Sequence, residues 1–381
     1  MPQPTVLSVF AVEPKRVGGT EAFARELSSQ LSEAGWASVL VFVKQPPQHV
    51  LQFLTLDNVT IEVLEDVWTV TPRTLWRVAR LLQKYQPAVT HLHYIKLLTP
   101  YPWLARLVAG SSVFFTDQTS QPEGFVPTPR PAWKRWVARV ITYPIQGLIS
   151  VSRYGQNTIL VSGLTSSAAS RVIYNSVDLS RGNPGAELGN AFRHRHAIPL
   201  DRLVVLQVSW LIPEKGLTDL LRAARIVLDT RRDVQFVFAG EGPSRAAFEA
   251  LATELGISEH VTWTGLVGDP FSEGLYAAAD IVCQVSRWQE VFGWVIAEAM
   301  LTEKPVLGTQ VGGIPELIVD GETGILVEAR NVVNIADGLC RLLNDPGLRT
   351  RLGRAGAGRC RTHFDLRQNV KEHLRLYGVP V

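Results

Sequence analysis

The segment Gln284 to Met300, QVSRWQEVFGWVIAEAM, places two glutamates around the predicted start of a helix. A buried strand should end at Ser286, and the loop that follows carries Glu290. Gly293 then opens a helix on which Glu298 lies in the second turn. An ionised carboxylate accepts two hydrogen bonds at once, which suits sugar hydroxyls. The alternative, that both glutamates are solvated surface charges, stays open.

The backbone at this helix start is suited to anions. The first N–H groups of a helix have no partner within it, and they attract phosphates and hydroxyls. Here they belong to Val291, Phe292 and Gly293, and a glycine allows close approach of a ligand. Together with the two glutamates, this backbone predicts a binding site for a sugar or a phosphate.

Other turns could approach a phosphate with backbone N–H groups. They contain Gly18 and Gly19, Gly240, and Gly312 and Gly313. None has the full G-x-G-x-x-G spacing, and no P-loop motif occurs, so each could equally be a tight turn. In SWLIPEKGL, Lys215 could reach a phosphate as a point charge, or it could be an ordinary solvated lysine.

Metal ligands are sparse in the sequence. His91 and His93 share one face of a predicted strand, but no nearby carboxylate or cysteine completes a site, which favours structural histidines. The chain has no D-x-D triplet and no C-x-x-C pair among its 3 cysteines. We therefore expect no cofactor, no essential metal and a reducing compartment.

The predicted helix Arg130–Pro144 carries Trp133 and Trp136 beside basic residues. Such a helix suits an anionic membrane surface. The favoured interpretation is an ordinary surface helix that packs its apolar stripe on a sheet. Membrane contact through residues 130–144 is the alternative.

The elements that position these residues alternate between strands and helices, which predicts an α/β fold with parallel sheets. The strands are expected at residues 6–12, 39–43, 60–64, 88–94, 112–116, 148–152, 203–208, 234–239, 261–264, 281–285, 305–308 and 324–327. Helices are expected at 20–34, 72–85 and 365–378, among others. With 38 basic and 35 acidic residues, the net charge is +3, which disfavours nucleic acid as a partner.

A Gly-, Pro- and charge-rich segment interrupts this alternation at 178–200. We take it as a linker between an N-terminal Rossmann-like domain, 1–177, and a C-terminal one, 201–363. Two such domains should face a cleft, with ligands at the carboxyl ends of the strands. The N-terminus is interpreted as a strand rather than a signal peptide, and no apolar stretch is long enough to span a membrane.

The chain resembles the retaining glycosyltransferases of the GT-B fold, family 4 (glycosyl transferases group 1). The resemblance is strongest from Val204 to Glu328 and is carried by several strings in the right order. These are PEKG at 213–216, FAGEGP at 238–243, VTWTGLV at 261–267, YAAADI at 276–281, and the two-glutamate segment followed by PVLGTQVGGIPELIVDGETGILV. It implies two Rossmann-like domains, with the helix at 364–381 returning to the first.

The resemblance also implies transfer of a sugar from a nucleoside diphosphate sugar with retention of configuration, and without a metal. By this analogy Glu298 holds the ribose, while Glu290 and the N–H groups that follow it hold the sugar. Lys215 neutralises the diphosphate, and Lys215 and Glu290 are the expected catalytic residues. Gly240 and Trp210 belong to the donor site, and Gly18 and Gly19 contact the donor from the first domain.

Three positions depart from the family pattern. Trp210 stands where the family usually has arginine, which removes one of two expected diphosphate cations. Thr116 stands in place of a histidine that contacts the donor sugar, and the adjacent Asp117 is a hypothetical substitute for it. Asn175-Ser176 replaces the common Asn-Gly at the domain junction.

The leading hypothesis is therefore a cytoplasmic glycosyltransferase, peripheral to the inner face of the membrane if residues 130–144 bind lipid. Its acceptor would be a lipid, a saccharide or a small molecule, in glycan or glycoconjugate biosynthesis. A second hypothesis is a catalytically weak partner subunit of the same fold that binds a nucleotide sugar or another transferase. A sugar-nucleotide epimerase of similar fold is a third.

Overall fold

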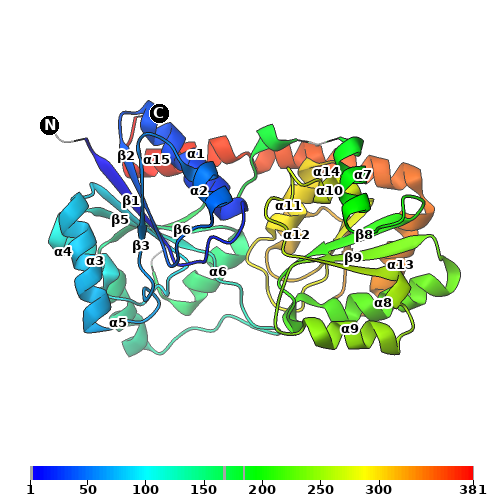
Figure 1. Ribbon diagram of the computed structural model, residues 1–381. Coiled ribbons are helices and arrows are strands. Elements are labelled where there is room, and N and C mark those ends of the chain that lie inside the picture. The colour runs from blue at the N-terminus through cyan, green and yellow to red at the C-terminus, as the bar shows by residue number, and fades with distance from the viewer. Residues whose placement is uncertain (1–2, 166–168, 183–184, 381) are drawn as a thin grey trace. The chain divides into compact units, whose positions relative to one another are not determined.

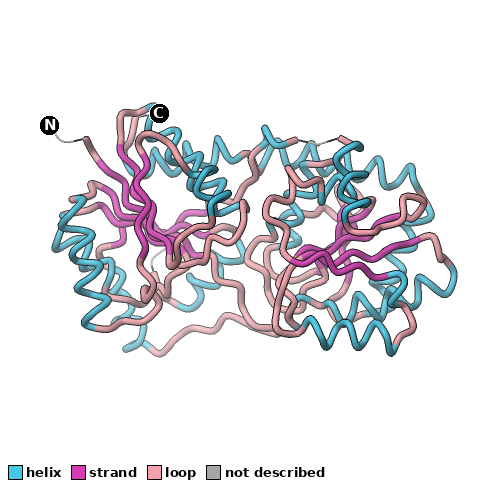
Figure 2. Tube along the Cα trace, in the orientation of Figure 1, coloured by secondary structure: helices cyan, strands magenta, loops and turns pink. Residues whose placement is uncertain are grey.

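The computed structural model describes residues 3–165, 169–182 and 185–380, and the chain divides into two compact units. Unit 1 comprises Met1–Thr119, Val126–Asn175 and Leu366–Val381. Unit 2 comprises Ser120–Phe125 and Ser176–Asp365. Each unit is a parallel sheet with helices on both faces (Figures 1 and 2), so the predicted fold class, two Rossmann-like domains, is confirmed.

Unit 1 is built on seven strands, in the order β3-β2-β1-β4-β5-β6-β7. The strands are β1 Thr5–Phe10, β2 Ala37–Phe42, β3 Val59–Val63, β4 Val89–His93, β5 Ser112–Asp117, β6 Ile145–Ser150 and β7 Ser170–Val172. The helices are α1 Gly19–Glu33, α2 Gln48–Leu54, α3 Pro72–Tyr85, α4 Tyr101–Ala109, α5 Ala132–Thr142, α6 Arg153–Ser162 and α15 Leu366–Tyr377.

Alternation along β1 directs its side chains to two separate cores. Val6 packs with residues of α1 and α15, whereas Leu7 and Val9 pack with residues of α3 and α4. Figure 1 shows α1, α2 and α15 on one side of this sheet and α3, α4 and α5 on the other. The last helix, α15, contributes Val370 and Leu374 to the core of unit 1.

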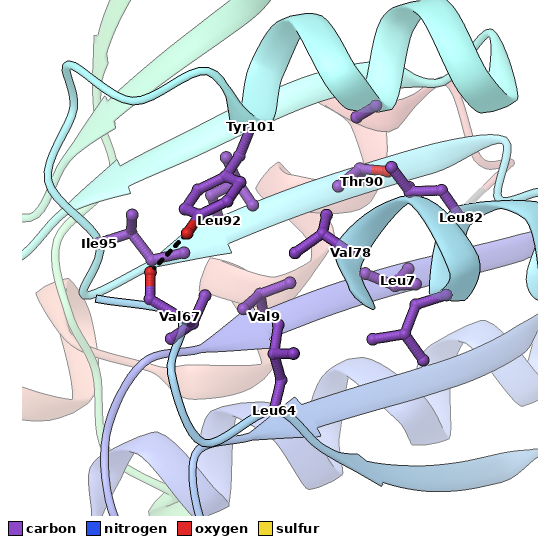
Figure 3. A pocket seen from close by; sticks show the side chains of 12 residues that line it. Leu7, Val9, Leu64, Val67, Val78, Leu82, Thr90, Leu92, Ile95 and Tyr101 are labelled. Carbon is purple, nitrogen blue, oxygen red and sulfur yellow. Dashed lines mark hydrogen bonds between the residues drawn. The ribbon is translucent and has the colours of Figure 1, made fainter. Parts of the chain in front are cut away.

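The core beneath α3 and α4 leaves a cavity of about 20 Å³ (Figure 3), room for roughly one water-sized sphere. It is lined by apolar side chains from the strands and both helices, and Tyr101 closes one side by donating to Val67 O at 2.9 Å. Because the lining is almost wholly apolar and the volume small, we interpret the cavity as a packing gap rather than a substrate site.

Unit 2 has a six-stranded sheet, in the order β10-β9-β8-β11-β12-β13. The strands are β8 Leu203–Val208, β9 Val234–Ala239, β10 Val261–Gly265, β11 Ile281–Gln284, β12 Val306–Thr309 and β13 Ile325–Val327. The helices are α7 Ala186–Arg195, α8 Leu217–Thr230, α9 Arg245–Glu254, α10 Leu275–Ala278, α11 Trp294–Leu301, α12 Ile314–Leu317, α13 Val332–Asn344 and α14 Pro346–His363. Short 3-10 turns occupy Leu179–Arg181, Pro213–Lys215 and Ser258–His260.

The strand order of unit 2 reverses between β8 and β11. From β8 the chain proceeds outward through β9 and β10, and then returns to place β11 on the other side of β8. Ligands of open parallel sheets bind beyond the carboxyl ends of the strands at such a reversal. In unit 2 this position lies between the loop after Val208 and the loop after Gln284.

The segment predicted as a linker, 178–200, lies in unit 2, although residues 183 and 184 are outside the described residues. It contains α7, which tertiary contacts hold in place. Arg193 of α7 pairs with Asp280 at 2.8 Å and donates to Ala278 O at 2.7 Å. The sequence of α7 has no clear apolar period, because polar contacts of Arg193 hold the helix in place as well as the burial of Phe192.

Helix α5 departs from its favoured interpretation. Its exposed side chains include Trp133 and Trp136, at 65% and 68% exposure, whereas Ala138 and Thr142 are buried. The apolar stripe therefore points away from the sheet, which contradicts the prediction that it packs inward. In the part of the chain that the structure describes, every helix is too short or too polar to cross a bilayer.

Candidate functional site

The loops after β8 and β11 meet through an ion pair between Lys215 and Glu290. The distance from Lys215 Nζ to Glu290 Oε1 is 2.6 Å, and the two side chains are 16% and 8% exposed. Ser286 Oγ donates to the same carboxylate oxygen at 2.5 Å. Lys215 Nζ also lies 4.5 Å from the ring centre of Trp288, a cation–π contact. The structure thus brings together the two residues predicted to be catalytic.

Burial alone would raise the pKa of Glu290. The charge of Lys215 and the hydrogen bonds from Lys215 and Ser286 outweigh it, so the pKa lies below its ordinary value. Glu290 is therefore ionised at neutral pH, and a buried carboxylate and an ammonium group face each other at the end of the sheet. An incoming phosphate could compete with Glu290 for this ammonium group.

The loop that carries Glu290 is held on two sides by backbone contacts. Gln289 and Gln121 exchange backbone hydrogen bonds of 2.8 and 3.0 Å, which brings Ser120 next to the site. Ser120 Oγ lies 3.5 Å from Glu290 Oε2 and accepts from Val291 N at 3.4 Å. On the other side, Gly313 N donates to Glu290 O at 2.7 Å. These contacts fix the carboxylate before any ligand arrives.

Gly293 begins α11 with a backbone conformation that favours glycine. Its φ is +121°, and an added Cβ would lie 3.2 Å from Gln284 Oε1 and 3.4 Å from Ile296 Cδ1. One turn further on, Glu298 is buried and accepts a hydrogen bond from the hydroxyl of Tyr276 on α10. The predicted site residues of this segment, 290–293 and 298, therefore lie along one short loop and helix.

Trp210 and Gly240 lie at the ends of neighbouring strands, β8 and β9. The Trp210 side chain is 58% exposed, so it is available to contact a ligand. Gly240 has φ +137°, and a Cβ there would lie 2.0 Å from Ser209 O. Its N–H donates to Gly265 O at 2.8 Å. Gly240 therefore shapes the loop that carries Trp210, and its own N–H is already used.

Gly18 and Gly19, the predicted phosphate-binding turn of unit 1, stand at the start of α1. The Gly18 N–H donates to Glu21 Oε2 at 3.0 Å, as in a capping box. Glu21 is 5% exposed and lies in the first helical turn. A carboxylate thus takes the place that an anionic ligand would otherwise take at this helix end.

Thr116 and Asp117 end strand β5, but their side chains have different surroundings. Thr116 is 3% exposed, and its hydroxyl pairs with His91 Nε2 at 2.7 Å, so it is a buried structural contact. Asp117 is half-buried, and burial raises its pKa to about 6. Thr119 N donates to Asp117 Oδ1 at 3.3 Å. Of the two, Asp117 is the one with exposed surface.

The predicted strand histidines, His91 and His93, are buried in unit 1 with their rings 3.8 Å apart. His91 Nδ1 pairs with the hydroxyl of Tyr377 on α15, and His373 of the same helix lies 5.7 Å from the His91 ring. Among the described residues, no group of three or more His, Cys, Asp or Glu side chains is arranged to hold a metal ion.

Several residues of the site escaped the sequence analysis. The sequence predicts only a strand end at Ser286 and a motif that begins at Tyr276, and it gives no signal at Ser120. The contact between Ser120 and Glu290 joins positions 170 apart in sequence. Spacing along the chain carries no signal for such a contact, although serine beside a buried carboxylate is a common donor.

Two family models match adjacent parts of the chain. Residues 17–181 match Glycosyltransferase Family 4, and residues 190–359 match Glycosyl transferases group 1. The second match contains the site residues of unit 2 described above, apart from Ser120 and Gln121.

Curated relatives are similar to the chain over part of its length. Alpha-D-kanosaminyltransferase of Streptomyces kanamyceticus is 37% identical over 165 residues, which are 43% of this chain and 42% of the relative. The GDP-mannose-dependent alpha-(1-6)-phosphatidylinositol monomannoside mannosyltransferase of Mycolicibacterium smegmatis is 31% identical over 212 residues, which are 54% of this chain and 55% of the relative. The aligned regions thus span about half of these relatives.

Solved structures match nearly the whole chain. A glycosyltransferase from Rickettsia africae ESF-5 has a TM-score of 0.81 at 19% identity and covers 99% of this chain and 98% of its own. Anabaena Alr3699/HepE in complex with UDP and glucose has a TM-score of 0.78 at 19% identity, with coverages of 97% and 99%. These structures show that the chain has the GT-B fold, while the family models match its first part to Glycosyltransferase Family 4 and its second part to Glycosyl transferases group 1.

Proposed function

We propose that the protein transfers a sugar from a nucleoside diphosphate sugar to an acceptor, with retention of the anomeric configuration and without a metal ion. The observation that carries this proposal is the Lys215–Glu290 ion pair, 2.6 Å long, at the strand-order reversal of unit 2. It supplies a fixed cation beside a helix start, where a diphosphate and a sugar would both find partners.

Each group at the site has a role in this reaction. Glu298, aligned by Tyr276, would accept hydrogen bonds from the ribose. Glu290 would hold the sugar hydroxyls. As the glycosidic bond breaks, negative charge grows on the leaving diphosphate, and Lys215 and the N–H groups at the start of α11 would stabilise it. Because these donors are fixed beforehand, little reorganisation is needed at the moment of reaction.

None of the roles proposed above makes a side chain the nucleophile that attacks the sugar. We therefore propose that the configuration is retained without a covalent sugar–enzyme intermediate. Glu290 is paired with a cation and bonded to Ser286, so we assign it to binding rather than to attack on the sugar. The leaving phosphate would then serve as the base for the incoming acceptor. Lys215 in place of a metal, and the lack of a D-x-D triplet, support the metal-independent part of the proposal.

The donor base, the sugar and the acceptor are to be found by experiment. Calorimetric titration with nucleoside diphosphates and their sugars identifies the donor, and release of the diphosphate with a panel of lipid, saccharide and small-molecule acceptors measures turnover. Proton NMR of the product reports the anomeric configuration. Turnover should persist in a metal chelator. An inverted product contradicts retention, and loss of turnover in chelator contradicts metal independence.

Glu290→Gln is the decisive variant. It keeps a hydrogen-bonding side chain and removes the charge, and we expect kcat to fall about a hundredfold or more while the diphosphate still binds. The matched control is Glu254→Gln, the same change at an exposed position at the end of α9. Donor binding without turnover for every acceptor in the wild-type protein would instead support the partner-subunit hypothesis, which the exposed Trp210 favours.

A further inference from the structure

Helix α5 exposes an apolar stripe that an ordinary surface helix would bury. Trp133, Trp136, Val137 and Val140 recur at helical spacing, and their exposures are 65%, 68%, 38% and 44%. The opposite side of the helix is the one that packs on unit 1, through the small residues Ala138 and Thr142. Exposed tryptophans at this spacing are costly in water, so such a stripe usually has a partner.

The stripe continues onto the neighbouring helices. Tyr143, 79% exposed, stacks on Trp103 of α4, whose Nε1 donates to Val140 O at 2.9 Å. Leu107 of α4 is 76% exposed and Trp76 of α3 is 58% exposed. Helices α3, α4 and α5 lie on the same side of the sheet of unit 1 (Figure 1), so their outer surfaces form one face, which we call the α3–α5 face.

The charge on the α3–α5 face has one sign. The three helices carry four basic residues on α3, one on α4 and three on α5, and their sequences contain no aspartate or glutamate. Lys84 pairs with Glu62 at 2.7 Å, and Arg77 lies 3.8 Å from Asp66, so neighbouring acids partly neutralise these two. The others make no ion pair with the residues that the structure describes: Arg73, Arg80, Arg106, Lys134, Arg135 and Arg139. The whole chain has a net charge of only +3, so this face concentrates positive charge.

We propose that the α3–α5 face binds an anionic phospholipid membrane. Exposed tryptophans insert at the level of the lipid headgroups, where their rings are partly in hydrocarbon and their N–H groups remain wet. Arginines and lysines around them bind lipid phosphates. A nucleic acid would match the charge but would leave the apolar stripe in water. A second copy of the chain would have to bring one positive face against another, which is unfavourable.

The test is sedimentation of the full chain with vesicles of phosphatidylcholine alone and of phosphatidylcholine mixed with phosphatidylglycerol. We expect binding to the mixed vesicles only, and weaker binding as the salt concentration rises. Binding that is equal for both vesicle types, or absent from both, would overturn the proposal. So would light scattering that shows a dimer which dissociates in Trp133→Ser/Trp136→Ser.

Two pairs of variants separate charge from apolar insertion. Lys134→Glu/Arg139→Glu should weaken binding to the mixed vesicles roughly tenfold or more, because four units of charge change near the surface. The matched control Arg222→Glu/Arg232→Glu makes the same change at exposed positions of unit 2 and should bind like the wild type. Trp133→Ser/Trp136→Ser should also weaken binding, whereas Trp210→Ala should not.

Each variant is first checked by circular dichroism and thermal unfolding, so that loss of binding is not loss of fold. All four altered side chains on α5 are exposed, and we expect native-like unfolding. If the control pair of unit 2 weakens binding as strongly as the α5 pair, binding depends on net charge alone and the assignment to the α3–α5 face fails. Binding to heparin without binding to vesicles would favour a polyanion and also overturn it.

Discussion

At the scale of single residues, the Lys215–Glu290 ion pair belongs to the proposed donor site and also contributes to the free energy of unfolding. Its two side chains are only 16% and 8% exposed, so each charge depends on the other for most of its compensation. Removal of one partner from a buried pair typically costs about 3–5 kcal/mol, because the remaining charge is left uncompensated. The pair therefore makes a contribution that can be measured without knowledge of the substrate.

Lys215→Met should lower the free energy of unfolding by about 3 kcal/mol at pH 7, since Glu290 loses its cation. The double variant Lys215→Met/Glu290→Leu should recover part of this loss, and urea unfolding of all four members of the cycle measures the coupling. Additive losses would contradict a direct interaction between the two charges.

The same pair gives a defined pH dependence. Because the pKa of Glu290 is lowered in the folded state, its stabilisation is present above the ordinary pKa of 4.5 and is lost as the pH falls through the folded value. The difference in unfolding free energy between the wild type and Lys215→Met should therefore be largest at neutral pH and shrink on acidification, because Glu290 takes up a proton first in the variant, where Lys215 no longer offsets burial, and only at lower pH in the wild type. A difference that grows on acidification would contradict this assignment.

Gly293 tests the backbone at the start of α11. With φ at +121°, Gly293→Ala forces a side chain into a strained conformation, and we expect a loss of about 1–3 kcal/mol of stability. The control is Gly358→Ala in α14, where nothing lies within 4 Å of the added Cβ and where alanine should stabilise by roughly 0.5–1 kcal/mol. Equal effects at both positions in thermal unfolding would rule out strain at Gly293.

At the scale of elements, α15 is joined to strand β4 through buried histidines. His91, His93 and His373 lie close together, and the pKa of each is lowered, mainly by burial. Around them are Tyr377 and Asn369 of α15, Thr116 of β5, Phe23 of α1 and Phe10 of β1, none of which carries a negative charge. Protonation of this cluster would therefore place uncompensated positive charge in the core of unit 1.

The cluster should make unit 1 sensitive to acid. The pKa of His373 falls from its ordinary 6.5 to about 4, so the unfolded state binds more protons between these values and stability decreases as the pH drops from 6.5 toward 4. Each such histidine contributes up to about 1.4 kcal/mol per pH unit. Unfolding of the wild type and of His373→Gln, followed across this range, measures the slope.

We expect a shallower slope for His373→Gln, because the amide can still donate to Asn369 O and does not titrate. The same change at the exposed His363, which lies outside the buried cluster, provides the matched control. Amide protection factors, which correct for the intrinsic pH dependence of exchange, should also fall in α15 on acidification before they fall in the helices of unit 2. Stability independent of pH over the whole range would contradict a neutral buried cluster.

Element boundaries differed in how well the sequence predicted them. Helix α3 and strands β8 and β9 were predicted with their observed ends, because a proline, a β-branched run or a clear period defines each one. Helix α2 is only seven residues long, and α4 carries a proline in its first turn, so neither has a strong period. Helix α5 has a clear period that indicated the wrong side, since periodicity locates an apolar stripe and not what covers it.

At the scale of the whole molecule, the sequence predicted two parallel sheets and the segment that holds Glu290 and Glu298. It could not predict which chain segments meet there. Residues 120–125 belong to unit 2, where Gln121 pairs with Gln289, although the strands on both sides of this segment belong to unit 1. Such a crossing depends on tertiary contacts between distant positions, which leave no local pattern.

The three-part composition of unit 1 has a consequence for the order in which the protein is made. Its sheet arises from the first half of the chain, but the face that α1 and α2 cover in part is completed only when residues 366–377 emerge to cover His91 and Phe114. All of unit 2 leaves the ribosome before then. Domains generally fold as they emerge during synthesis, N-terminal first. Synthesis of this protein therefore begins with unit 1 and also ends with it. The core of unit 1 remains incomplete, and exposed to water, while unit 2 is translated.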